Sequence, residues 1–157
     1  MRGEEGDRLR KLGYELPRVP NPAGSYVPAT ITGPLLFTAG QLPFEKGQLR
    51  YTGKVGKDVS AEEAEEAARL CALNGLAAVE AEAGSLEGVR RVLKVTGYVA
   101  SASGFTRQPE VINGASDFLG EVFGERGAHA RSAVGVAELP LDAPVEVELI
   151  VELTLSS

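Results

Sequence analysis

The chain has 157 residues, of which 43% are hydrophobic and 24% charged, and its net charge at pH 7 is −6. This length suits a single domain, residues 1–157, with its own hydrophobic core. The negative balance argues against a broad nucleic-acid surface. One cysteine and one histidine cannot build a Cys/His zinc site within one chain. The lone Cys71 fits a reducing cytosol. The charged N-terminus and the lack of a long apolar run predict a cytoplasmic protein without signal peptide or membrane span.

The first third of the chain predicts a polar start followed by a hairpin. Residues 4–13 form a short helix anchored by Leu9 and Leu12, and residues 15–28, with four prolines, are extended along the surface. The Gly33-Pro34 turn then joins strands at 29–32 and 35–39. Residues 48–52 are a weak edge strand.

Two helices and a strand follow. Ser60 caps a helix in a capping box with Glu63, and Gly84 ends it. Residues 90–101 have strand character, with Leu93, Val95, Gly97 and Val99 on one face. A second helix follows Pro109, and its core-facing stripe consists of Val111, Ile112, Ala115, Phe118, Leu119, Val122 and Phe123.

The last quarter predicts two neighbouring antiparallel strands, 130–139 and 145–153, joined by a proline-containing turn. This pairing would set Arg131 beside the glutamates of the second strand. The pattern is α+β: one mixed sheet with two helices on a single face. Since apolar residues lie on both faces of the strands, we expect self-association.

The motifs for nucleotide binding, metalloprotease and serine-hydrolase chemistry are absent from the sequence. His129, in a helix-to-strand loop, is interpreted as solvent-exposed, and Cys71 as a buried filler of the first long helix. Arg131 has two interpretations from its pattern alone. It forms a structural ion pair with Glu146 or Glu148, or it is a fork that captures a planar carboxylate.

Residues 131–140, RSAVGVAELP, and residues 145–148, VEVE, form a pattern with a close parallel in a known family. They resemble the Arg-Ser-x-Val-x-Val-x-x-Leu-Pro signature of the RidA (YjgF) family and the strand that follows that signature. Upstream, residues 37–43, FTAGQLP, resemble its Phe-Thr-Ser-Gly-Gln-Ile/Leu-Pro stretch, and Tyr26 lies in a matching start. The resemblance runs from about residue 21 to the C-terminus. A proline-rich N-terminal extension, about residues 1–24, is typical of a longer, less characterised branch.

The resemblance implies a chorismate-mutase-like fold, a homotrimer with clefts between subunits, and hydrolytic deamination of 2-imino acids or enamines to 2-keto acids and ammonia. It implies that Arg131 binds the substrate carboxylate and that Glu146 positions or activates the attacking water. Tyr26 would lie in the cleft near the substrate. Substrate-binding positions would be Ala39, Gly40, Gln41, Asn113 and Ala133. No metal or organic cofactor is implied.

Two departures concern the cleft wall, because Ala39 replaces the family's serine and Ala133 replaces a common cysteine. They leave the physiological substrate and the retention of deaminase activity open. The first alternative is a non-catalytic trimer that binds a small carboxylate such as a keto acid. An endoribonuclease, a label that some family members carry, is disfavoured by the acidic composition and the single histidine.

Overall fold

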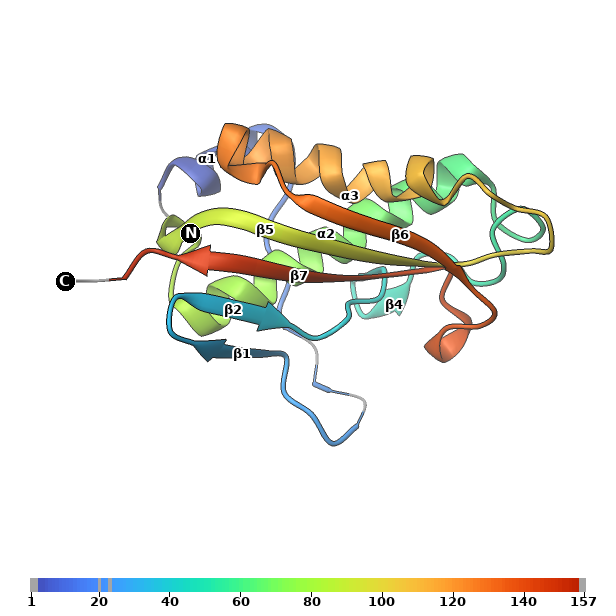
Figure 1. Cartoon of the computed structure of the whole chain (residues 1–157), viewed down its shortest axis with the longest axis horizontal. Coiled ribbons are helices and arrows are strands. Elements are labelled where there is room, and N and C mark those ends of the chain that lie inside the picture. The colour runs from blue at the N-terminus through green and yellow to red at the C-terminus, as the bar shows by residue number, and fades with distance from the viewer. Residues whose placement is uncertain (1–2, 20, 23, 156–157) are drawn as a thin grey trace.

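The computed structural model describes residues 3–19, 21–22 and 24–155 of the chain. Its centre is a five-stranded mixed sheet with strand order β1-β2-β7-β5-β6, and Figure 1 shows the helices α2 and α3 on one side of it. The strands are β1 (Ala29–Thr32), β2 (Leu35–Thr38), β5 (Val89–Ala100), β6 (Ala130–Val136) and β7 (Val145–Leu153). A separate ribbon consists of β3 (Phe44–Glu45) and β4 (Gln48–Leu49). The predicted α+β architecture is confirmed.

The long helix α2 (Ala61–Ala83) begins and ends where its caps predict. The Ser60 hydroxyl accepts from the Glu63 amide at 3.1 Å, and the Glu63 carboxylate accepts from the Ser60 amide at 2.9 Å. Gly84 ends the helix in the left-handed region, with φ 88°. Small residues let α2 approach its neighbours closely. A Cβ on Gly75 would lie 2.9 Å from Leu149 Cδ1 of β7.

The second long helix, α3 (Gln108–Phe123), carries the predicted core stripe, and all seven of its members are buried. Cys71 is buried as well, and burial raises the pKa of its thiol well above the usual range. The described residues also form three short 3₁₀ turns: η1 (Leu86–Gly88), η2 (Gly124–Gly127) and η3 (Pro140–Asp142). Within the described residues, no helix is both long enough and apolar enough to cross a membrane.

The pairing predicted for the last two strands is wrong. β6 is an edge strand that pairs with β5 in parallel, and β5 separates it from β7. The reason is the crossover helix α3: a strand, a helix and a returning strand form a unit whose strands are parallel. Arg131 is consequently registered with Val95 of β5 instead of a glutamate of β7.

The prediction that Leu93 shares a face of β5 with Val95, Gly97 and Val99 is also wrong. A register irregularity between Val92 and Lys94 makes both Val92 and Val95 buried and leaves Leu93 half-exposed. Such a bulge inserts one residue and resets the alternation of faces. Beyond it, Val95, Gly97 and Val99 face the helices as predicted.

The N-terminal segment is docked onto the helix layer. Helix α1 (Glu4–Lys11) buries Leu9, whereas Leu12, predicted as a second anchor, is 38% exposed. The Arg8 guanidinium donates to the Val122 carbonyl of α3 at 3.0 Å. Tyr14 then packs edge-on against Phe118 with ring centroids 5.3 Å apart. From there the chain passes over α2 towards the loop before β1.

Candidate functional site

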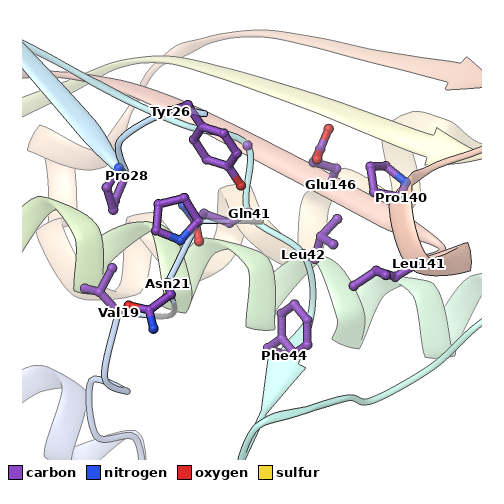
Figure 2. A pocket seen from close by; sticks show the side chains of 12 residues that line it. Val19, Asn21, Tyr26, Pro28, Gln41, Leu42, Phe44, Pro140, Leu141 and Glu146 are labelled. Atoms are coloured by element: carbon purple, nitrogen blue, oxygen red, sulfur yellow. The ribbon is translucent and has the colours of Figure 1, made fainter. Parts of the chain in front are cut away.

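A pocket of about 460 Å³ lies beside the open face of the sheet, the face that carries no helices. Its walls come from five parts of the chain: the N-terminal segment, the loop after β2, β3, η3 and β7 (Figure 2). The lining residues are Val19, Asn21, Pro22, Tyr26, Pro28, Gly40, Gln41, Leu42, Phe44, Pro140, Leu141 and Glu146. A shallower hollow continues from it past Ala39 and Thr38, so that Glu146, Tyr26 and Gly40 border both.

Glu146 is the ionisable group of this pocket. It is half-buried on the open face of β7, registered with Tyr98 of β5. Burial raises the pKa of the Glu146 carboxyl above its usual 4.5, and the neighbouring Glu148 carboxylate adds to the rise. A carboxylate with a raised pKa holds a proton more readily at moderate pH, which suits a group that takes a proton from water.

The loop after β2 is fixed against β7 by its backbone. Gln41 and Val147 exchange two backbone hydrogen bonds of 2.8 and 3.0 Å. The buried amide of Asn74, on α2, donates to the carbonyls of Leu42 and Phe44 at 3.0 Å each. These bonds satisfy buried backbone groups and set the loop rigidly beside Glu146.

The open face next to the pocket is rich in carboxylates. Tyr98 donates its hydroxyl to Glu148 Oε1 at 2.7 Å, and this bond, with burial, raises the pKa of Tyr98 to about 12. Since Tyr98 engages Glu148, that carboxylate has a donor within its own chain. Phe37, Val134 and Ile150 share the face, and Phe37 and Val134 are 38% and 44% exposed.

Arg131 lies on the other face of the sheet. Its partner Val95 is buried under the helices, whereas Glu146 is registered with Tyr98 on the open face. Residues directly opposite on paired strands share a face, so Arg131 and Glu146 point away from each other within one chain. The predicted ion pair of Arg131 with Glu146 or Glu148 is therefore not formed.

Arg131 is held by α3. Its Nη1 donates to Asn113 Oδ1 at 2.7 Å and to Ser116 Oγ at 3.2 Å. Across the described part of the chain this guanidinium has no carboxylate partner. Both of its bonds go to neutral oxygens, so its positive charge remains available to an anion.

His129 extends this cluster and is half-buried, so its predicted solvent-exposed position is wrong. Its Nδ1 donates to the Gly127 carbonyl at 2.6 Å, which in the neutral ring leaves Nε2 to accept from the Ser116 hydroxyl at 2.9 Å. The hydroxyl lone pairs of Ser116 then face Arg131. A hydrogen-bonded chain from Gly127 to Arg131 results.

Comparison with known proteins identifies the family. Residues 6–153 match the family described as "YjgF/chorismate_mutase-like, putative endoribonuclease". The chain belongs to this YjgF family. The matched range includes most of helix α1 and all of the prolines before β1.

Two relatives are similar to this chain over almost its whole length. "Protein TCP17" of Trypanosoma cruzi is 43% identical over 152 residues, 96% of this chain and 95% of that protein. The crystal structure of a protein of unknown function from Agrobacterium tumefaciens is 48% identical, with a TM-score of 0.90 over 97% of this chain and 93% of that one.

"Putative reactive intermediate deaminase TdcF" of Escherichia coli is 31% identical over 144 residues, 90% of this chain and 96% of that protein. The crystal structure of Escherichia coli TdcF with bound serine is 27% identical, with a TM-score of 0.61 over 87% of this chain and 94% of that one.

The structure divides the residues that the YjgF resemblance singles out into two groups. Tyr26, Gly40, Gln41 and Glu146 line the pocket, and Ala39 borders its continuation. Arg131 and Asn113 are bonded to each other at the β6 edge. Ala133 lies two residues along the same strand, registered with Gly97 of β5.

Sequence reasoning missed other residues of the site. Asn74, Ser116 and Tyr98 are ordinary polar residues in a helix or strand, and no local pattern distinguishes them. The apolar wall formed by Leu42, Phe44 and Leu141 depends on how the segment after β2 meets η3, about 100 residues further along the chain. Only the proline-rich segment that contributes Val19 and Pro22 had a sequence signal, since it was predicted to lie along the domain surface.

Proposed function

We propose that this protein hydrolyses reactive 2-imino acids and their enamine tautomers to 2-keto acids and ammonia, at sites between the subunits of a homotrimer. The observation that carries the proposal is the separation of Glu146 and Arg131 onto opposite faces of the sheet. Each group belongs to a partial site: a carboxylate in a pocket, and a guanidinium at an exposed strand edge. A second copy that sets its β6 edge against the pocket would complete the site.

The exposed surfaces support such an assembly. Phe37 and Val134 are large apolar side chains on the open face, and Tyr26, at the pocket mouth, is 51% exposed. Burial of apolar surface is the main favourable term in subunit association.

In the proposed reaction Arg131 of one subunit binds the substrate carboxylate with two parallel hydrogen bonds. These two bonds hold C2 of the protonated imine next to a water molecule beside Glu146 of the neighbouring subunit. The water oxygen bonds to C2 while Glu146 accepts its proton, and the C=N double bond becomes a C–N single bond. Glu146 then gives this proton to the nitrogen and the C–N bond breaks, so that ammonia leaves. The hydroxyl oxygen forms the C=O bond of the keto acid, and its proton returns to Glu146.

The relatives support this reaction class, because TdcF carries the name of a reactive intermediate deaminase. The residues support it too. A protonated imine is already electrophilic, so one base of moderately raised pKa and one anchor for the carboxylate suffice. Tyr26, whose hydroxyl points towards the pocket centre in Figure 2, would donate to the developing oxygen.

The test uses a 2-imino acid generated in the assay from its amino acid by an amino-acid oxidase, with keto-acid release followed against the spontaneous rate. We expect acceleration by the wild-type chain and its loss in Arg131→Ala. Arg90→Ala is the matched control, since Arg90 is an exposed arginine on the adjacent strand that pairs with Glu152 at 3.7 Å. No acceleration by the wild-type chain would refute the proposal.

A second candidate function is binding without turnover. The description of TdcF with bound serine favours it, because serine carries the carboxylate that Arg131 would hold. Calorimetry with 2-ketobutyrate would detect such binding, and its loss in Arg131→Ala would assign it to the same anchor. Binding combined with no acceleration of hydrolysis would establish this candidate instead of the enzyme.

A further inference from the structure

The pocket beside Glu146 extends well beyond the groups that the reaction needs. Glu146 and Tyr26 stand at one end, and Figure 2 shows Phe44 and Val19 at the other. In the same view Leu42 lies between Glu146 and Phe44, and Leu141 lies beside Leu42 on the side of Pro140. A substrate held by its carboxylate and reacting at C2 would leave this far end filled with water unless its side chain entered it.

The far end is apolar. Val19, Pro22, Leu42, Phe44 and Leu141 contribute carbon atoms, while Asn21 and Gln41 supply the amide groups. The Gln41 amide already has a hydrogen-bond partner within the chain, because its Nε2 donates to the Ala39 carbonyl at 3.3 Å. A pocket of this size with a mainly apolar lining and few polar groups is typical of sites for small organic ligands.

Leu141 is an independent indication that an apolar group binds here. Its side chain is 62% exposed, and its backbone lies in the left-handed region at φ 59°, ψ 22°. This conformation is unfavourable for a branched side chain and is imposed by surrounding bonds: the Gly53 amide donates to the Asp142 carbonyl at 2.8 Å. The fold thus holds a leucine in a strained conformation at the rim of the pocket, where an apolar ligand would cover it.

The segment that forms the opposite wall follows an anchored part of the chain. Val19 and Pro22 follow Tyr14, whose ring contacts Phe118 and whose hydroxyl accepts from Arg69 Nη1 at 2.9 Å. Upstream, Leu9 is buried and Glu5 pairs with Arg126. These contacts fix the start of the segment on the helix layer, so its proline-rich part reaches the pocket from a defined point.

We infer that the pocket is a side-chain subsite built with the N-terminal segment, and that the favoured substrates are 2-imino acids with a large apolar side chain, such as those derived from leucine and phenylalanine. This inference rests on the proposed function and names its substrate class. Leu141, Phe44 and Val19 are then specificity-determining residues, because they contact the part of the substrate that does not react.

The experiment compares kcat/KM for imines generated from alanine, leucine and phenylalanine with the full-length protein. We expect the leucine- and phenylalanine-derived imines to exceed the alanine-derived imine by at least about tenfold, since each buried methylene favours binding of the transition state. Leu141→Ala should reduce this ratio several-fold. Leu155→Ala is the matched control, because Leu155 is a leucine of similar exposure, 66% against 62%, outside the pocket lining, and should leave the ratio unchanged.

Equal values for the three imines, or a ratio that Leu141→Ala does not alter, would overturn the inference while leaving the deaminase proposal intact. If the hydrolysis of no imine is accelerated, the deaminase proposal fails. The side-chain subsite is then tested by the binding of keto acids. Calorimetry should then give about tenfold tighter binding of 4-methyl-2-oxopentanoate than of pyruvate, reduced in Leu141→Ala. Equal affinities would overturn it.

Discussion

The carboxylate of Glu146 lies directly against Gly40. A Cβ built on Gly40 would stand 2.8 Å from Glu146 Cδ and 3.0 Å from its Cγ, closer than side-chain atoms approach one another. The backbone of the loop after β2 therefore forms one wall of the Glu146 site. Any side chain at position 40 must move the carboxylate.

The first prediction follows from this contact. Gly40→Ala should leave the fold intact, because the obstructing atoms belong to a side chain that can swing away, but it should lower kcat by about 10- to 100-fold by displacing the base. Deaminase kinetics and a melting curve check it. Gly88→Ala is the control, since a Cβ there meets no atom within 4 Å. Unchanged kcat in Gly40→Ala would show that the position of Glu146 is unimportant.

The second prediction concerns stability. The folded-state pKa of Glu146 is raised, so this group favours the folded state below its usual pKa of 4.5, and that contribution is lost as pH rises through the raised value. Glu146→Gln removes the charge that burial and Glu148 disfavour. We expect it to abolish turnover and to raise Tm by a few degrees at pH 7, with the gain vanishing below about pH 4.5. A lower Tm at pH 7 would contradict the assignment.

The third prediction concerns the pH dependence of activity. The acid limb of kcat/KM should follow deprotonation of Glu146 and lie above pH 4.5. Glu148→Gln removes a neighbouring negative charge, so the limb should move to lower pH. Tyr98→Phe is the control for the lost hydrogen bond, because it removes the donor to Glu148 and keeps the charge. If both variants moved the limb equally, the charge of Glu148 would not be the cause.

The fourth prediction concerns the support of Arg131. Asn113 accepts from Arg131 Nη1 at 2.7 Å, so Asn113→Ala should loosen the guanidinium and raise KM about tenfold with little change in kcat. Asn113→Asp keeps an acceptor but adds a negative charge beside the substrate carboxylate, and we expect a larger rise in KM. Steady-state kinetics separate the two cases. A smaller KM for Asn113→Asp than for Asn113→Ala would mean that geometry outweighs charge there.

Local signals in the sequence predicted the elements well. The Ser60 capping box and the stripe of α3 depend on neighbours a few residues apart, and both are confirmed. Features that depend on residues far apart in the sequence were not predicted. The parallel pairing of β6 with β5 follows from the crossover through α3, and the bulge near Leu93 follows from the pairing of β5 with β7.

The site shows the same limit. Four residues of the pocket were named from their resemblance to family motifs, and these four, Tyr26, Gly40, Gln41 and Glu146, do lie together. Arg131 and Asn113, both named from the resemblance, are bonded to each other. The opposite faces of Arg131 and Glu146 could not be predicted, because the face depends on which strand β6 joins.

The most direct measurement of the central claim is complementation between two inactive variants, Arg131→Ala and Glu146→Gln. In the proposed homotrimer, chains of both kinds that are co-expressed in equal amounts would form mixed assemblies, in which some clefts receive Arg131 from one chain and Glu146 from the other. If each site combines two subunits, about one quarter of the clefts are complete, and the mixture recovers about a quarter of the wild-type deaminase activity. Activity no higher than that of either variant alone would contradict a site shared between subunits.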